Sequence, residues 1–246
     1  MDTSKLSGFA SISLEEMKGV SLLKRVDTKF LTTSSELSKL LPFLYSDYQI
    51  LEIDGNRLMN YSTLYFDTKD LHYYKEHHNG KAKRQKIRIR RYEESDICFL
   101  EVKEKQPTGM TNKVRCSIDD FETILSTESK KFIRRVTKKN LELEPALHNY
   151  FQRFTLVNTQ RFERVTIDIG LEYKKDTTTK KFKNVVVIEV KQKKQNTKTP
   201  IYSTLKSNRI RIVSFSKYCM GVATIFSSVK SNKFKEINLK INQLNN

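Results

Sequence analysis

The sequence predicts an α+β fold in which many antiparallel strands are accompanied by few helices. Stretches of alternating apolar and polar residues recur along the chain, which is the period of a half-buried strand. Amphipathic helical patterns are few and short. With seven Gly and four Pro the chain has no low-complexity linker. Residues 1–246 are therefore expected to form one domain, with a core over about 20–222 and a basic tail over about 231–246.

The first elements are expected to alternate between helix and strand. Ser13 and the glutamate three residues after it have the spacing of a capping box, which predicts a helix over 13–20. A strand is expected over 26–32. The serines that follow it can cap a second helix, which carries leucines on one face and breaks near Pro42.

Strand patterns dominate the remainder of the chain. Strands are expected over 60–67, 83–92, 97–105, 112–118, 153–158, 164–172, 185–191 and 210–213. A turn is expected at Pro107-Thr108-Gly109. Helices are expected over 119–126, over 133–150 with a break at Pro145, and over 218–230; residues 234–246 are expected to form a helix or to fray.

Several polar and aromatic residues between the strands are interpreted as structural. Asp67 ends a strand and is expected to cap the following turn. Tyr73 and Tyr74 are expected to pack in the core. The His77-His78 pair is followed by Asn79-Gly80 and is expected to lie in a solvated loop rather than to bind a metal.

The charge of the chain is strongly unbalanced. It has 46 Lys and Arg against 28 Asp and Glu, a formal net charge of +18. Such an excess repels itself in a compact state, so the expected partners are polyanions. Nucleic acid, phosphate chains and an anionic membrane surface are all compatible with the charge alone.

Cysteine usage and hydropathy narrow the class of protein. The three cysteines are far apart and show no CxxC spacing, which argues against a disulfide framework or a zinc cluster and favours a reducing cytoplasm. No apolar segment follows Met1, so no secretory signal is expected. The longest apolar runs are too short for a membrane span.

One predicted strand carries three cations on a single face. Lys86, Arg88 and Arg90 share one side of this strand, while two isoleucines share the other. Each like-charge pair at about 4–6 Å costs on the order of 1 kcal/mol in water. An anion among the three side chains would remove that cost.

An acid-x-Lys unit recurs on three predicted strands, as Asp27-Lys29, Glu101-Lys103 and Glu189-Lys191. For any one strand the alternative interpretation is a surface strand with a solvated charged face. If the strands instead close into a barrel with their charged faces inward, the interior suits a triphosphate with a divalent metal.

The residue types on these faces suit phosphate binding by side chains. Arginine contacts phosphate oxygens in a bidentate manner and lysine supplies a point charge. A carboxylate such as Glu189 could hold Mg²⁺ or Mn²⁺ that also bridges phosphate oxygens. Glu101 and Asp168 stay open between a salt-bridge role and a metal role. No Walker A motif occurs, so a backbone phosphate loop is not expected.

Nine short motifs occur in a familiar order over roughly residues 20–222. They are RVDTKF (25–30), STLYFDT (62–68), KIRIRRY (86–92), LEVK (100–103), NKVR (112–115), YFQRFTLVN (150–158), ERVTID (163–168), VIEVK (187–191) and FSKY (215–218). In this ordered set the chain resembles the VTC domain family of polyphosphate polymerases in its bacterial form, within the triphosphate tunnel metalloenzymes or CYTH superfamily. The resemblance implies a closed, barrel-like tunnel of antiparallel strands, open at both ends, with flanking helices.

The resemblance also implies site residues, position by position. The implied catalytic residues are Lys29, Arg88, Arg90, Lys103, Arg153, Arg164 and Lys217. The implied substrate-binding residues are Lys86, Lys113, Lys191 and Ser216, and the implied metal ligand is Glu189. Arg161 is the alternative to Arg153 as the first family arginine of its strand pair.

The implied reaction is transfer of the γ-phosphoryl group of ATP onto a growing polyphosphate chain, with Mn²⁺ or Mg²⁺ as cofactor. ATP and inorganic polyphosphate are the expected partners, together with a separate membrane protein that exports or channels the product. No specific nucleic acid is expected. The resemblance places the enzyme in the cytoplasm, at the inner face of the membrane where that partner holds it.

Three alternative functions stay open. Tunnel relatives that hydrolyse triphosphates start with ExExK, whereas this chain has DxK with Arg25 at the additional acid position, which favours the polymerase. A nucleic-acid-binding module is disfavoured because no aromatic stripe follows the cationic strands. A non-catalytic polyphosphate-binding subunit would not need Arg88, Arg90, Glu189 and Lys217 together.

Overall fold

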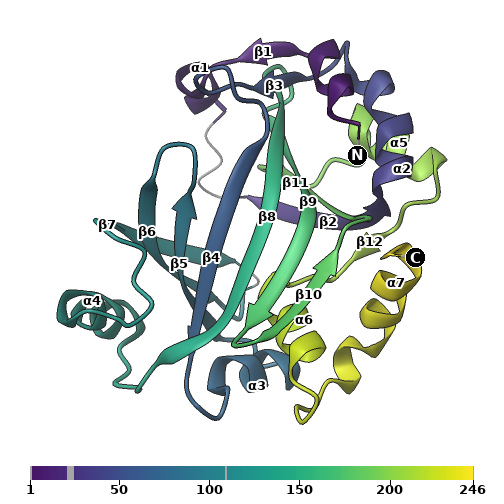
Figure 1. The fold of residues 1–246 in the computed structure, drawn as a ribbon. Helices are drawn as coiled ribbons and strands as arrows, with labels where there is room; N and C mark the ends of the chain where they lie inside the picture. The colour runs from purple at the N-terminus through teal and green to yellow at the C-terminus, as the bar shows by residue number, and fades with distance from the viewer. Residues whose placement is uncertain (1, 21–24, 109, 246) are drawn as a thin grey trace.

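The computed structural model describes residues 2–20, 25–108 and 110–245, and a large sheet forms its centre (Figure 1). Its strands are β1 Ala10–Ile12, β2 Val26–Thr33, β3 Gln49–Leu51, β4 Met59–Asp67, β5 Arg84–Tyr92, β6 Ile97–Lys105, β7 Thr111–Ile118, β8 Glu144–Asn158, β9 Glu163–Lys175, β10 Thr178–Phe182, β11 Val185–Gln192 and β12 Ile212–Val213. Nine of them follow the path β12-β2-β11-β9-β8-β4-β5-β6-β7, with antiparallel neighbours. β10 pairs with β9, and β3 pairs with β8 and, in parallel, with β1.

Short helices surround this sheet. The α-helices are α1 Leu14–Lys18, α2 Ser34–Leu40, α3 His72–His78, α4 Thr127–Thr137, α5 Pro200–Ser207, α6 Lys217–Ile225 and α7 Lys235–Asn245. Three 3-10 helices are η1 Thr3–Gly8, η2 Leu41–Leu44 and η3 Asn232–Phe234. The mixture of helices with a mainly antiparallel sheet is the predicted α+β fold. In the described part of the chain, no helix combines the length and apolar character needed to cross a membrane.

The sheet is strongly curved. The Lys29 ammonium on β2 donates to the Phe215 carbonyl at 2.9 Å, and the Lys86 ammonium on β5 donates to the Ser216 hydroxyl at 2.9 Å. Four strands separate β2 from β5 along the path, so the sheet bends until both reach the segment before α6. This gives the sheet a concave face that resembles the wall of a tunnel.

The expectation of a closed barrel needs correction. Within the described residues, β12 and β7 end the path and do not pair with each other, so the sheet is tunnel-like but open. β12 has two residues and offers few backbone groups for a closing ladder. β7 is exposed over Thr111–Arg115.

Helices cover both faces of the sheet and leave one part of the concave face charged. α2, η2 and α5 pack on the outer face of β2, β8, β9 and β11, in the cluster that contains Phe30 and Ile167. α4 packs on the outer face of β4, β5 and β6 around Phe132. α6 and α7 fill the apolar end of the concave face, against Leu31 and Val187. The remaining concave surface carries the cations.

The sequence correctly predicted most strands and several helices. The capping box of α1 is present: the Glu16 amide donates to the Ser13 hydroxyl at 3.2 Å, and the Ser13 amide donates to the Glu16 carboxylate at 2.8 Å. All nine predicted strands occur, with shifted ends, and residues 235–245 are helical. The predicted turn at Pro107-Thr108-Gly109 falls partly outside the described residues, since Gly109 is not described.

Two predicted helices are wrong. Residues 119–126 form bends and loop, in which the Glu122 carboxylate accepts from the amide of Ser126, the N-cap of α4, at 2.9 Å. Residues 133–150 divide between α4, which ends at Lys138 in a left-handed conformation, and β8. The predicted break at Pro145 lies inside β8, at an irregularity in its pairing with β4.

The expected loop around His77 and His78 is also wrong, because these residues end α3. His78 is buried, and its Nε2 lies 2.8 Å from the Asn232 Oδ1. Tyr73 and Tyr74 pack in the core as predicted. Asp67 caps the following turn as predicted, accepting from the Thr68 amide at 2.8 Å, and it also accepts from the Tyr73 and Tyr74 amides of α3 at 2.9 and 3.0 Å.

We expect Tyr218→Phe to lower the free energy of unfolding by about 1.5–3 kcal/mol, because the Tyr218 hydroxyl donates to the fully buried Asp67 carboxylate. The matched control is Tyr202→Phe, whose buried hydroxyl has no hydrogen-bond partner among the described residues and should cost little. Urea unfolding of both variants measures the difference. Equal losses would show that the link between Asp67 and α6 contributes nothing.

Candidate phosphate-binding site

The concave face brings the predicted site residues together. They come from seven strands and from the start of α6, where Ser216 is the N-cap. Lys29 lies opposite Glu189, and Lys191 lies opposite Arg164 in neighbouring ladders. Lys86, Lys103 and Lys113 lie in one row across β5, β6 and β7. Directly opposed residues share a face, so the alternation read from the sequence orients these side chains correctly.

Three carboxylates each join two of the predicted cations. The first is Glu101, which is fully buried. The Arg88 guanidinium contacts it at 2.5 and 2.6 Å, and the Lys113 ammonium contacts its other oxygen. Burial alone would raise the pKa of Glu101, but Arg88, Arg90 and Lys113 outweigh burial and hold the pKa far below its ordinary value. Glu101 is therefore a salt-bridge residue, and it binds Arg88 rather than the expected Lys103.

Asp168 on β9 is the second such carboxylate. Arg153 lies opposite it on β8 and donates from two nitrogens at 2.5 and 2.8 Å, while the Lys217 ammonium contacts the same carboxylate. Burial would raise the pKa of Asp168, but Arg153 and Lys217 lower it well below its ordinary value. The bidentate geometry identifies Arg153, rather than Arg161, as the arginine of this strand that reaches the concave face.

Glu189 on β11 is the third. Its oxygens lie 3.5 Å from the Lys29 ammonium and 2.7 Å from the Lys191 ammonium. Lys191 also donates to the Thr166 hydroxyl at 2.6 Å. Burial opposes ionisation of Glu189, but Lys191, Lys29 and Lys103 lower its pKa well below the ordinary value. The carboxylate is thus ionised and available to a cation.

Four of the ten predicted cations have no carboxylate partner among the described residues: Lys86, Arg90, Lys103 and Arg164. Arg90 donates to the Thr63 hydroxyl at 3.2 Å, and Arg164 lies 4.0 Å from the Met17 sulfur. The field of Arg88, together with burial, lowers the pKa of Lys103 well below its ordinary value. A bound polyanion would compensate these four positive charges and so stabilise the site.

Two aromatic side chains that the sequence did not indicate support the arginines. Tyr61 and Phe151 stack with ring centroids 5.1 Å apart. The Arg90 guanidinium lies 5.3 and 5.5 Å from these two rings, and the Arg153 guanidinium lies 5.3 Å from each. Contact with aromatic faces holds a guanidinium in place without neutralising it. The pairing of β4 with β8 creates this contact, so no local signal could reveal it.

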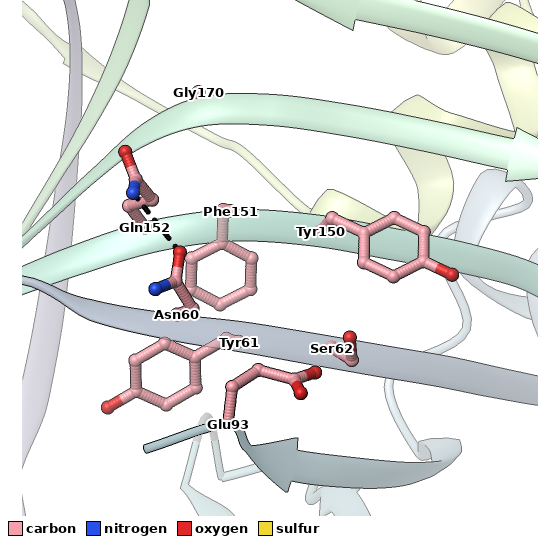
Figure 2. Close-up of a pocket in the computed structure, with 8 residues that line it drawn as sticks. All are labelled: Asn60, Tyr61, Ser62, Glu93, Tyr150, Phe151, Gln152 and Gly170. Atoms are coloured by element: carbon pink, nitrogen blue, oxygen red, sulfur yellow. Dashed lines mark hydrogen bonds between the residues drawn. The ribbon is translucent and has the colours of Figure 1, made fainter.

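A hollow of about 290 Å³ lies near the same strands but is a different feature (Figure 2). Its lining residues are Asn60, Tyr61, Ser62, Glu93, Tyr150, Phe151, Gln152 and Gly170. Asn60 and Gln152 are hydrogen-bonded to each other at 3.1 Å and belong to the outer face of β4 and β8. The lining has no lysine or arginine, so it does not suit phosphate.

The residues fit a divalent metal that is bound mainly by phosphate. No group of three or more His, Cys, Asp or Glu side chains able to hold a metal occurs within residues 2–20, 25–108 and 110–245. Glu189 is the carboxylate that the resemblance assigns to a metal, and its oxygens lie 3.5 and 2.7 Å from the Lys29 and Lys191 ammonium groups. Mg²⁺ commonly takes one or two protein carboxylates and fills its other positions with phosphate oxygens and water. A single protein carboxylate, as Glu189 supplies, is compatible with such an ion.

Without bound phosphate, the folded protein is expected to be more stable at alkaline pH. Burial lowers the pKa of Lys86 and of Lys217 to about 8, from an ordinary value of 10.5. Between these values the unfolded chain binds more protons than the folded protein, so these lysines make the free energy of unfolding rise with pH. Urea unfolding at pH 7.5 and 9.5 should show a larger rise for the wild type than for Lys86→Met. An equal rise in both proteins would contradict the lowered pKa of Lys86.

Comparisons with known proteins give one extensive match. The family model described as VTC domain matches residues 24–226. No curated protein matches the chain. Among solved structures, a Hippeastrum protein described as having a dominant triphosphatase activity is 16% identical with a TM-score of 0.49, covering 82% of this chain and 98% of that chain.

Two further solved structures are similar at the same level. A Vibrio parahaemolyticus protein is 9% identical with a TM-score of 0.48, covering 82% of this chain and 99% of that one. A Pyrococcus horikoshii protein is 11% identical with a TM-score of 0.46, covering 81% and 99%. These similarities are too low to indicate an activity, so the family match is the comparison that bears on function.

Proposed function

We propose that this chain, which belongs to the VTC domain family, is a polyphosphate polymerase that transfers the γ-phosphoryl group of ATP to a growing phosphate chain. The match over residues 24–226 confirms the resemblance seen in the order of the sequence motifs. Membership of the family supports phosphoryl chemistry, and the contacts on the concave face support the finer assignment.

One observation carries the proposal: the ten predicted cations lie on the concave face, six of them are paired with Glu101, Asp168 or Glu189, and four keep no carboxylate partner in the described structure. A triphosphate carries enough charge to engage these four. The six paired cations can exchange a carboxylate for phosphate as the anion enters, since they are already oriented. A surface that extends over seven strands is longer than one triphosphate requires and suits a chain.

The residues would act by position and charge. Arg88 and Arg90, two residues apart on β5, would clamp neighbouring phosphates, and Arg153 would do so from β8. Holding donor and acceptor in line and neutralising the spreading charge is the main task of an enzyme in phosphoryl transfer. No side chain is required as a covalent nucleophile.

Glu189 would hold Mn²⁺ or Mg²⁺ against the phosphates, where the metal would neutralise developing negative charge. Lys29 and Lys191 keep the Glu189 carboxylate ionised and oriented at 3.5 and 2.7 Å. The start of the site favours polymer formation over hydrolysis, because the chain has DxK with Arg25 where hydrolytic tunnel relatives carry an additional acid.

Two further parts of the proposal concern the cell. The product would pass to a separate membrane protein, the partner that the family resemblance implies. The enzyme would then work in the cytoplasm, at the inner face of the membrane. Co-purification with an integral membrane protein from the native cell would support this arrangement.

The proposed function is tested with purified protein, ATP and Mn²⁺. Long phosphate chains resolved on a gel, formed with stoichiometric ADP and lost in Glu189→Gln, would support the polymerase. Phosphate release without chains would identify a hydrolase instead. Polyphosphate binding with neither product would identify a binding subunit.

A further inference from the structure

The exposed surface of α4 carries cations and no carboxylate beyond its first turn. Its exposed cations are Lys130, Lys131, Arg134, Arg135 and, at the C-cap, Lys138. Glu128 in the first turn is the single acid of the helix. The opposite side of α4 is apolar and buried, through Phe132 and Ile133. We call the five exposed cations the α4 arc.

The α4 arc is electrostatically unfavourable by itself. Lys130 and Arg134, and Lys131 and Arg135, are spaced four residues apart, and like charges at this spacing on a helix destabilise it. In the described part of the chain, no carboxylate lies within ion-pair distance of the arc. Arg135 stacks at 5.6 Å on the Phe132 ring. The arc therefore suits an anionic partner.

The α4 arc and the concave face lie on opposite sides of the edge of the sheet that β7 forms. β7 is the edge strand of the sheet, and its concave side carries Lys113 and Arg115, the latter 4.3 Å from the Phe99 ring. The outer side of β7 carries Cys116, which packs with the α4 cluster and whose thiol interacts electrostatically with Arg135. Figure 1 shows α4 at the margin of the molecule beside β6 and β7. An anionic chain leaving the concave face around β7 would meet the arc.

We propose that the α4 arc is a second binding surface for polyphosphate, which holds the part of the product that has left the concave face. This inference rests on the proposed polymerase function. A linear polyanion binds to a row of neighbouring cations and needs no apolar contacts. The α4 arc is such a row.

Other polyanions fit the arc less well. A membrane would favour apolar side chains among the cations. The exposed Ile124, at 81%, instead lies before the helix, close in sequence to Asp119 and Asp120, which an anionic membrane repels. The arc has no aromatic residue on which a nucleic-acid base could stack.

The test is a binding titration of the full chain with long-chain inorganic polyphosphate and with tripolyphosphate. The variant Lys130→Gln/Lys131→Gln/Arg134→Gln removes three charges and keeps residues that favour a helix. Its matched control is Lys180→Gln/Lys206→Gln/Lys235→Gln, which removes three exposed charges from β10, α5 and α7, away from α4 (Figure 1).

We expect the α4 variant to bind long-chain polyphosphate about tenfold more weakly or worse at low salt, with a salt dependence reduced by about three ions. Tripolyphosphate, which the concave face can hold alone, should bind as in the wild type. In the polymerase reaction the α4 variant should make shorter chains at an unchanged initial rate of ADP release.

Other outcomes would overturn the proposal. Equal losses in the α4 variant and its control would mean that only total charge matters. Unchanged polyphosphate binding with lost binding to phosphatidylserine vesicles would make the arc a membrane surface. Because the titration uses added polyphosphate, it decides the role of the arc even if no chains form from ATP, a result that would instead contradict the proposed function.

Discussion

Asp168→Asn is expected to lower the free energy of unfolding by about 3–5 kcal/mol, the usual cost of removing one partner from a buried ion pair. Asp168 is 1% exposed and joins Arg153 to Lys217. The amide would leave two largely covered cations, Arg153 and Lys217, with no opposite charge at this position. Urea unfolding at neutral pH measures the loss.

The same variant should be rescued in part by substrate. Tripolyphosphate can replace the lost carboxylate beside Arg153 and Lys217, so its addition should raise the stability of Asp168→Asn more than that of the wild type. Asp96→Asn is the control, because Asp96 forms an exposed pair with Arg91 that is worth at most about 1 kcal/mol. A loss below about 1 kcal/mol for Asp168→Asn would show that the pair does not hold the concave face together.

Arg90→Gln is expected to lower kcat/KM for ATP about a hundredfold, the usual effect of losing one preorganised donor to a charged group. Arg90 is buried, lies against Tyr61 and Phe151, and has no carboxylate partner among the described residues. Its charge is therefore available to phosphate from the start.

The neighbouring residue provides a matched control for this prediction. Arg91 points to the outer face of the same strand and pairs with Asp96 at 2.6 Å. Arg91→Gln should change kcat/KM by less than about twofold. Steady-state kinetics of the two variants compare the two faces of one strand. Similar losses in both would mean that the concave face is not where ATP binds.

The strands of the site were predictable because charge alternates with hydrophobicity in them. In β5, Ile87 and Ile89 are fully buried on the outer face, while Arg88 and Arg90 point to the concave face. One face of such a strand packs in the apolar core. The alternation of residues along the strand therefore assigns each side chain either to the buried face or to the concave face. The same reasoning located Glu189 and Lys191 on β11.

Partners across the sheet could not be predicted from the same pattern. Asp168 binds Arg153 and Lys217, and Lys217 lies 49 positions away in the chain on a helix. Glu101 binds Arg88 across a ladder instead of Lys103 on its own strand. Alternation shows which face a residue occupies, but the register and curvature of the sheet decide which charges meet.

The wrong elements have similar physical causes. β8 is buried on both faces along much of its length, so its apolar residues do not alternate and Ala146 and Leu147 are both covered. α3 has Leu71 at its N-cap in a left-handed conformation with no side-chain cap of its own. Its amide groups are satisfied by Asp67 from the preceding strand, a signal too distant for a local rule.

The most direct test of the phosphate-binding concave face is calorimetric titration of the wild type and of Lys86→Gln/Arg90→Gln/Lys103→Gln with tripolyphosphate. These three residues are cations of the concave face without a carboxylate partner in the described structure. We predict one site in the wild type, with an affinity that falls steeply with salt, and at least a hundredfold weaker binding in the variant. Undiminished binding in the variant would contradict the assignment of phosphate to this face.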